Sequence, residues 1–305
     1  MGKTILINSM DWASFIYIII PVHNRMEFTR QCLNSLTQQT YLKFKIIVID
    51  DGSSDGTTDM IQKEFPEVVL LHGDGNLWWT GATNLGVKHV LKNATLRDYV
   101  LTMNDDVIVQ PNYLEILLEC ASKHTRSLIG SIALNSDNEA IIEDGGVKIN
   151  WYTAKFSWLT RGREYKTVMD EEPSVIPVDA LSGRGTLIPV ETFQKVGLYD
   201  FLRLPHYGAD YEFSHRAKKK GYNLIIDYKS FVVNKVGFTG IDNERHSFKW
   251  NGFLKNFFAK GSPFCIRYRW NFARLTCPKL LLPSFFIFDI GRVFLGTLRN
   301  QLIST

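Results

Sequence analysis

Residues 44–57 have the sequence FKIIVIDDGSSDGT, in which an apolar, strand-like run ends in two adjacent acids and a turn rich in Gly and Ser. The same arrangement returns at residues 99–106, where an apolar run ends in Asn-Asp-Asp. Carboxylates at the end of a buried strand are costly unless they are paired or bind a ligand. Because ligands of open α/β sheets bind at the carboxyl ends of strands, we expect a site here for a hydrated divalent cation and a polar, nucleotide-like ligand.

Strand-like and helix-like stretches alternate through the first half of the chain. Runs of β-branched residues predict strands, and apolar residues three or four apart predict helices. The expected strands lie at 15–20, 44–49, 68–71, 99–103 and 128–134, and the expected helices at 25–39, 57–65, 81–91 and 111–121. This order predicts an α/β fold with a mostly parallel sheet that helices flank on both faces. Beyond residue 141 the pattern loosens into short strands, with one further helix expected at 209–220.

The composition is that of an ordinary globular protein. The chain has 305 residues, of which 45% are hydrophobic and 22% charged, which is enough for one large domain or a domain with an appendage. Its four cysteines show no Cys-x-x-Cys spacing, which argues against a zinc site or a disulfide framework and favours a reducing compartment. We expect no secretory signal, and the apolar run at 15–20 is too short to span a bilayer.

Charge is distributed unevenly along the chain. Residues 245–305 carry ten Lys or Arg and one acid, whereas residues 1–244 carry 25 basic and 30 acidic side chains. We therefore predict a body at 1–244 and a helical, aromatic and basic C-terminal extension at 245–305. A proline and charged residues interrupt the apolar stretch at 280–298, which makes it a poor spanning helix. The extension suits either a membrane interface near anionic lipid or a helical cap on the body or on a second copy of the chain, as in a homodimer; no motif supports nucleic-acid binding.

Three polar segments follow predicted strands. PVHNR at 21–25 suits a strand-to-helix turn in which Pro21 stops the strand and Asn24 caps the helix. DDGSSDGT at 50–57 suits a turn before a helix, but a turn alone does not explain two adjacent acids. NDDV at 104–107 has acids flanked by apolar runs, and oxygen ligands of this kind suit Mg²⁺ or Mn²⁺.

In this order and spacing, the three segments resemble the donor half of a family 2 glycosyltransferase with a GT-A fold. The resemblance covers about residues 15–236 and implies a donor half at about 15–134 and an acceptor half at about 135–244. It implies that Asp51 contacts the nucleobase and that Asp106 binds the metal-diphosphate, with Mg²⁺ or Mn²⁺ as the cofactor. The expected donor-binding residues are Pro21, His23, Asn24, Arg25, Asp51, Trp79, Gly81, Asn84, Asn104 and Asp105.

Two further segments complete the expected pocket. Residues 75–86 (GNLWWTGATNLG) open a helix, and two adjacent tryptophans followed by small residues can frame a sugar nucleotide, although one of them can belong to the core instead. Residues 182–186 (SGRGT) suit either a loop close to phosphates or to the transferred sugar, or a plain hairpin turn. The residues expected on the acceptor side are Gly183, Arg184, Gly185 and Glu212.

The stretch 207–216 (YGADYEFSHR) holds the expected catalytic residue. Glu212 and Arg216 are four apart and can pair on one helix face, and Asp210 alone could be a simple first-turn acid. Asp210 aligns, however, with the family's Glu-Asp motif, and the resemblance implies that it is the general base.

Three residues depart from the family pattern. Asn104 stands where the first acid of the DxD-like motif usually is, and Ala209 replaces the Glu that precedes the base. Asn234 stands where the family often has a histidine that helps to hold the metal-diphosphate, which leaves His246 as a substitute to consider.

These features predict an inverting glycosyltransferase that moves a sugar from a nucleotide diphosphate sugar to a hydroxyl of a glycan or a lipid-linked saccharide. The motif order and the Trp-Trp segment most resemble rhamnosyltransferase-type members that build bacterial surface polysaccharides, which implies dTDP-L-rhamnose as the donor. We expect a cytoplasmic protein, peripheral at the inner face of the cell membrane. Two alternatives stay open: a nucleotidyltransferase, which the lack of glycine in PVHNR disfavours, and a non-catalytic, membrane-associated partner subunit with a degenerate site.

Overall fold

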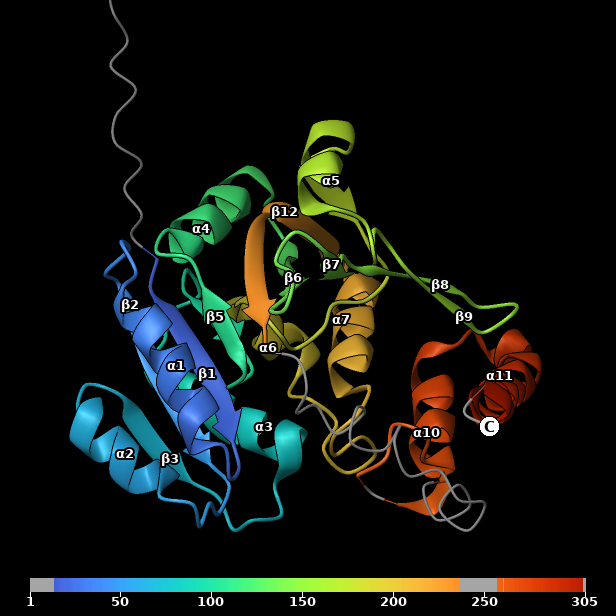
Figure 1. Ribbon diagram of the computed structural model, residues 1–305, viewed down its shortest axis with the longest axis horizontal. Coiled ribbons are helices and arrows are strands. Elements are labelled where there is room, and N and C mark those ends of the chain that lie inside the picture. The colour runs from blue at the N-terminus through green and yellow to red at the C-terminus, as the bar shows by residue number, and fades with distance from the viewer. Residues whose placement is uncertain (1–13, 236–256, 260, 304–305) are drawn as a thin grey trace, which may run out of the picture.

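The computed structural model describes residues 14–235, 257–259 and 261–303, and one large sheet forms its centre (Figure 1). The strand order is β10-β12-β6-β11-β4-β1-β2-β3, with β5 paired to β12 and β7 to β6. The strands of this sheet are β1 (Ile16–Val22), β2 (Phe44–Asp50), β3 (Val69–His72), β4 (Tyr99–Thr102), β5 (Val107–Val109), β6 (Ser127–Asn135), β7 (Ile142–Asp144), β10 (Val175–Pro177), β11 (Thr186–Pro189) and β12 (Asn223–Asn234).

Strands β1 to β4 form the parallel half of the sheet. β1 pairs in parallel with β2 and with β4, and β2 pairs in parallel with β3. The carboxyl ends of β2 and β4 therefore lie at one edge of the sheet, and both acidic segments begin there. The predicted parallel arrangement is confirmed for this half. The other half is mixed, because β11 runs antiparallel to β4 and β6 while β12 runs parallel to β6.

Helices flank both faces of the sheet, as predicted. They are α1 (Met26–Thr37), α2 (Thr57–Glu64), α3 (Trp78–Val90), α4 (Tyr113–Lys123), α5 (Tyr165–Glu171), α6 (Val190–Val196) and α7 (Ala209–Lys219). Leu33 of α1 shares one buried cluster with Ile18, and Val87 of α3 shares another with Ile19. Successive residues of β1 thus serve opposite faces. Burial of each such side chain contributes about 1.5–3 kcal/mol.

The observed elements differ from the predicted ones in three places. Helix α3 begins at Trp78, three residues before the predicted start, because the Trp78 N–H is capped by the distant carboxylate of Asp51 at 2.9 Å. The two short strands expected near the end of the body are one long strand, β12, with an irregularity between Asp227 and Phe231. The loosely patterned region also contains an antiparallel hairpin, β8 (Val147–Asn150) and β9 (Lys155–Trp158).

The C-terminal part consists of α10 (Ile266–Thr276), the 3₁₀ helix η1 (Lys279–Leu281) and α11 (Leu282–Ile303). Tyr268 of α10 shares a buried cluster with Phe213 of α7. Arg269 of α10 donates two hydrogen bonds to Asp289 of α11, at 2.7 and 2.8 Å. Within the described ranges, no helix is long and apolar enough to cross a membrane. The start of the predicted extension, 245–256, lies outside the described residues.

Two helical glycines provide a test of the packing around β1 and β2. A Cβ at Gly86 of α3 would lie 2.8 Å from Ile19 and 2.9 Å from Ile49, whereas a Cβ at Gly291 of α11 would meet nothing within 4 Å. Gly86→Ala should lower the free energy of unfolding by about 1–3 kcal/mol, because it overpacks a closed core. Gly291→Ala should leave that free energy unchanged or raise it by up to about 1 kcal/mol, since alanine favours a helix. Urea unfolding measures both, and equal stabilities would contradict this packing.

Candidate active site

Two buried carboxylates at the end of β4 share one arginine. Nη1 of Arg25 lies 3.2 Å from Oδ1 of Asp105, and Nη2 lies 3.0 Å from Oδ2 of Asp106. Both acids are 3% exposed. Burial, with a contribution from the charge of Asp106, raises the pKa of Asp105 to about 7, and the Arg25 guanidinium opposes this rise. One oxygen of each carboxylate, Oδ2 of Asp105 and Oδ1 of Asp106, has no hydrogen-bond partner among the described residues.

Asn234 ends the neighbouring strand β12 beside these acids. It pairs with Val107, and the N–H of Lys235 donates to the backbone oxygen of Asp106 at 3.0 Å. The Asn234 amide nitrogen donates to Oε2 of Glu143 at 2.8 Å, while its Oδ1 is buried and, like the two acid oxygens, has no hydrogen-bond partner in the described part of the chain. A hard divalent cation prefers ligands of this kind.

The chemistry of these residues therefore fits Mg²⁺ or Mn²⁺, provided that the amide oxygen of Asn234 serves as a ligand beside the carboxylate oxygens of Asp105 and Asp106. Among the described residues, no group of three or more His, Cys, Asp or Glu side chains could hold a metal. His246, the substitute ligand considered from the sequence, lies outside the described residues. Sequence reasoning did not single out Glu143. Nothing in the sequence distinguishes this acid except its place in the loosely patterned region after residue 141.

Asp51, the expected nucleobase contact, holds the loop before α3. Its Oδ1 accepts the Gly75 N–H at 2.8 Å and its Oδ2 accepts the Trp78 N–H at 2.9 Å. Trp78 has a φ of 53°, which is unusual for a bulky side chain and is maintained by this bond. A Cβ at Gly73 would lie 2.3 Å from Oδ1 of Asp51, so the loop passes directly over the carboxylate. Base binding by Asp51 stays a prediction.

The PVHNR and DDGSSDGT loops are tied to each other. His23 Nδ1 lies 2.6 Å from the backbone oxygen of Asp51, and the Asn24 side-chain oxygen accepts the Ser54 N–H at 2.7 Å. The prediction that Asn24 caps α1 is wrong, because Asp55 instead accepts the Met26 N–H at 2.9 Å.

Pro21 lies within β1, which continues for one residue to Val22. The prediction that Pro21 stops the strand is therefore off by one position. A proline is tolerated there because the pairing of β1 with β4 ends at Ile19, whose oxygen accepts the Met103 N–H, so no described strand faces the same side of Pro21 two residues later.

Trp79 connects the two halves of the body. Its Nε1 donates to Oδ1 of Asn104 at 3.3 Å, and its ring lies so close to Gly183 that a Cβ there would be 2.1 Å away. The Gly183 N–H in turn donates to Oδ2 of Asp210 at 2.9 Å. This series of contacts brings Asp210, at the start of α7, to the sheet edge that carries the 104–106 segment.

Asp210, the expected general base, is held by two backbone N–H groups. Its two oxygens accept the N–H groups of Gly183 and Tyr211, each at 2.9 Å, which fixes the orientation of the carboxylate. Burial raises its pKa, the two N–H donors oppose the rise, and the charge of Asp144 adds to it. A carboxylate with a raised pKa binds a proton more readily than an ordinary aspartate does. Asp144 is a second acid near Asp210, and sequence reasoning missed it.

Two of the expected donor residues make packing contacts, and their binding of the donor stays a prediction. Both ends of the Asn84 amide bond the backbone of Tyr199, at 2.9 and 3.0 Å. A Cβ at Gly81 would lie 2.9 Å from the ring of Phe201, so glycine allows close approach here. Both residues join α3 to the segment that leads into α7.

The residues expected on the acceptor side differ in what they contact. Arg184 pairs with Asp144, the acid whose charge acts on Asp210, at 3.5 Å. Gly185 directly precedes β11, its N–H donates to the Thr102 oxygen at 2.9 Å, and its φ is 81°. Glu212 is 1% exposed and pairs with Arg216 at 2.6 Å. This is the pairing on one helix face that their four-residue spacing predicts. Arg216 also donates to the Val196 and Leu198 oxygens, at 2.6 and 2.8 Å, so Glu212 helps to hold α7 on the body.

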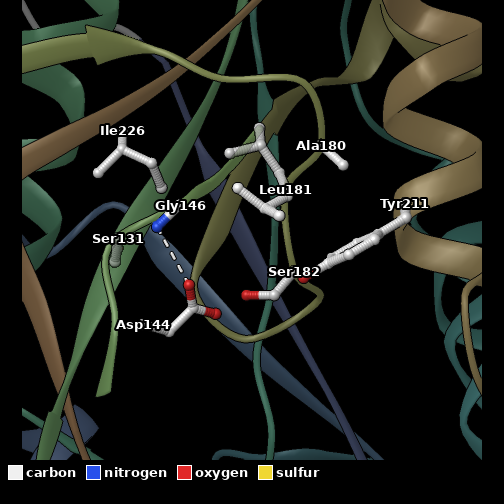
Figure 2. A pocket seen from close by; sticks show the side chains of 9 residues that line it. Ser131, Asp144, Gly146, Ala180, Leu181, Ser182, Tyr211 and Ile226 are labelled. Atoms are coloured by element: carbon white, nitrogen blue, oxygen red, sulfur yellow. Dashed lines mark hydrogen bonds between the residues drawn. The ribbon is translucent and has the colours of Figure 1, made fainter. Parts of the chain in front are cut away.

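A small polar cavity lies beside Asp144 (Figure 2). Asp144, Ser182 and Tyr211 line it together with Ser131, and the Gly146 N–H donates to Oδ1 of Asp144 at 3.0 Å. Its volume of about 10 Å³ is room for one water molecule at most. The cavity is therefore too small to be the sugar site.

Comparison with known proteins agrees with this geometry. The family model described as Glycosyl transferase family 2 matches residues 17–177, more than half of the chain. An N-acetylglucosaminyl-diphospho-decaprenol L-rhamnosyltransferase of Mycobacterium tuberculosis is 27% identical over 232 residues, which cover 70% of this chain and 74% of the relative. An uncharacterized glycosyltransferase of Rickettsia bellii is 26% identical over 246 residues, which cover 79% of this chain but 33% of that protein, so the chain spans about a third of its length.

Two solved structures show the same fold. GalNAc-T7 with UDP, GalNAc and Mn²⁺ has a TM-score of 0.59 at 18% identity, over 81% of this chain and 50% of that one. A mannosyltransferase from Pyrobaculum calidifontis, in complex with GDP-Man and Mn²⁺, has a TM-score of 0.57 at 14% identity, over 93% of this chain and 72% of that one. The predicted GT-A fold and the predicted class of enzyme, a glycosyltransferase, are confirmed. With this fold and a family match over more than half of its length, the chain belongs to glycosyl transferase family 2.

Proposed function

We propose that the protein transfers a sugar from a nucleotide diphosphate sugar to an acceptor hydroxyl with inversion, and that Asp210 is the general base. The observation that carries this proposal is the series of contacts from Asn104 through Trp79 and Gly183 to Asp210. It brings a half-buried carboxylate of raised pKa to the edge where the acids of β2 and β4 gather.

In the proposed reaction, the Asp210 carboxylate takes the proton of the acceptor hydroxyl. The hydroxyl oxygen then forms a bond to the anomeric carbon from the face opposite the diphosphate. The bond from that carbon to the diphosphate oxygen breaks, and its electron pair leaves with the nucleoside diphosphate. General-base assistance of this kind contributes about 10²–10⁴-fold to the rate. The N–H donors of Gly183 and Tyr211 keep the carboxylate from rotating away.

We further propose Mg²⁺ or Mn²⁺ as the cofactor, held by oxygens of Asp106, Asp105 and Asn234. When bound, such an ion neutralises charge on a departing diphosphate. Arg25 keeps the two carboxylates together at the end of β4. Glu143 holds the Asn234 amide nitrogen, which leaves the amide oxygen available as a ligand.

Replacement of Asp210 tests the assignment of the base. Asp210→Asn should lower kcat for transfer by about 10²–10⁴-fold, because the amide cannot take the proton. The Kd of the donor, measured by calorimetry, should stay unchanged, since the substitution keeps the shape of the side chain. Asp170→Asn, at an exposed position on α5, is the matched control and should transfer normally. Turnover retained in Asp210→Asn would remove this residue from the mechanism.

Replacement of Asn234 tests the cation site without any substrate. Asn234→Leu should weaken Mn²⁺ binding by about 10–100-fold, the usual cost of disturbing a metal site, whereas Asn234→Asp should tighten it by adding a charge. Electron paramagnetic resonance of free Mn²⁺ measures the affinity directly. Asn138→Asp, at an exposed position, controls for added charge alone. If all four proteins, including the parent chain, bind Mn²⁺ equally, Asn234 is not a ligand.

We also propose dTDP-L-rhamnose as the donor and a glycan or lipid-linked saccharide as the acceptor, in bacterial surface polysaccharide synthesis. The named mycobacterial relative, a rhamnosyltransferase of a diphospho-decaprenol substrate at 27% identity, supports this choice. We propose that the protein works at the inner face of the cell membrane, where such an acceptor would be presented.

A panel of nucleotide sugars tests the donor. With Mn²⁺ present, the true donor at 100 times its Kd should stabilise the fold by about 2.7 kcal/mol, which thermal unfolding detects. Stabilisation by dTDP-L-rhamnose above the other sugars supports the proposal. Stronger stabilisation by another nucleotide sugar would identify that molecule as the donor instead. Pyrophosphate release from a nucleoside triphosphate would favour a nucleotidyltransferase, and the absence of any response would favour a non-catalytic subunit.

A further inference from the structure

Helix α11 is apolar on two faces. On the inner face, Phe285 and Val293 are 1% and 9% exposed, and Phe285 shares a buried cluster with Ala273 of α10. On the outer face, Ile287, Phe288 and Leu295 are 69%, 52% and 65% exposed. A helix on the surface of a soluble protein usually has polar residues on the side away from the core. The outer side of α11 therefore requires an explanation other than packing on the body.

The exposed residues form one continuous surface. Ile287, Gly291 and Leu295 follow each other at four-residue spacing, which places them on one side of the helix, and Phe288 lies next to them. A Cβ at Gly291 would meet nothing within 4 Å, so the middle of this side is open. Leu280 of η1, 96% exposed, extends it toward the N-terminus. We call these residues, Leu280, Ile287, Phe288, Gly291 and Leu295, the outer α11 face.

An aromatic residue of α10 borders this region. Trp270 is 38% exposed, and its ring lies 4.9 Å from that of Phe286 in α11. Tryptophan is favoured where an apolar surface meets water at a membrane boundary, because its ring is apolar and its N–H is polar. Figure 1 places α11 at the outer edge of the molecule, beyond α10 and away from β1 to β3.

The exposed charges of the described C-terminal helices are of one sign. Arg267, Arg274, Lys279 and Arg292 are exposed. The one acid that the sequence has between residues 245 and 305, Asp289, is 4% exposed and takes both hydrogen bonds from Arg269. Among the described side chains of α10, η1 and α11, no exposed acid therefore balances this positive charge.

Charge also discriminates between two occupants of this surface. A second copy of the chain, docked through the same face by a two-fold axis, would bring the same cations against each other. An anionic lipid surface instead complements them, and its acyl region accepts the exposed Ile, Phe and Leu side chains.

We propose that the outer α11 face docks on an anionic lipid bilayer, with α11 lying in the plane of the interface. Ile287, Phe288 and Leu295 enter the boundary between headgroups and acyl chains. Lys279 and Arg292, on either side along the helix, meet the lipid phosphates, although Arg292 also donates to the Thr153 oxygen at 2.7 Å. The inference identifies the surface that a membrane-bound acceptor substrate would require, but it depends on α11 alone and not on the proposed chemistry.

Vesicle flotation of the full chain tests this docking. We expect binding to phosphatidylcholine vesicles that contain phosphatidylglycerol, and much weaker binding to vesicles of phosphatidylcholine alone. Ile287→Ser with Phe288→Ser should lower the partition coefficient at least about ten-fold, because two apolar side chains no longer enter the lipid. Leu42→Ser with Leu96→Ser, at positions 81% and 56% exposed outside the C-terminal part, is the matched control and should bind like the parent chain.

Three results would overturn the proposal: no binding of the parent chain to anionic vesicles, equal loss in the control, or equal binding to neutral vesicles. A dimer in light scattering that Ile287→Ser with Phe288→Ser dissociates, without vesicle binding, would assign the face to a second copy. If the double variant does not fold, Leu295→Ser alone carries the test, with a smaller loss expected. Stabilisation by nucleotide sugar should be the same in every variant, which separates failure of docking from failure of the proposed function.

Discussion

The packing of the Trp79 ring on the backbone of Gly183 is the contact on which the candidate site depends. Any side chain at position 183 would collide with that ring, since even a Cβ would be 2.1 Å from it. On one side the indole bonds Asn104 at the end of β4, and on the other Gly183 bonds Asp210 at the start of α7. Together with the pairing of β11 with β4, this contact keeps the acids and the proposed base close to each other, so that a single ligand could meet both.

The acids themselves are kept in place by different means. Arg25 pairs with both Asp105 and Asp106, while Asp51 accepts the backbone N–H groups of Gly75 and of Trp78 at the start of α3. A buried charge without such partners would cost several kcal/mol, so each partner is needed for folding as well as for position. The remaining oxygens of Asp105, Asp106 and Asn234 have no such partner within the described residues, and this incomplete satisfaction marks where a cation would act.

Local sequence was sufficient for the parallel half of the sheet and its acidic edge. The runs before Asp50 and Asn104 are short, β-branched and apolar, and the carboxyl ends of parallel neighbours must share an edge. The contacts that single residues make were not predictable in the same way. The partners of Asp51 lie 24 and 27 residues away, and Asn84 bonds a backbone 115 residues away, so neither bond leaves a local pattern. Glu143 and Asp144 lie in a region without periodicity, where nothing distinguishes them from surface acids.

The central claim is that the acids after β2 and β4 and the proposed base Asp210 form one site. Its most direct test is to measure the kcat of Gly183→Ala together with the affinity of this variant for the donor. A methyl group at this position must displace the Trp79 ring and with it the alignment of Asp210, and a misplacement of about 1 Å costs about 10²-fold in rate. We predict a loss of that order in kcat with an unchanged donor Kd, while Gly291→Ala behaves like the parent chain. An unchanged kcat would show that the two halves act without this contact and would contradict the account.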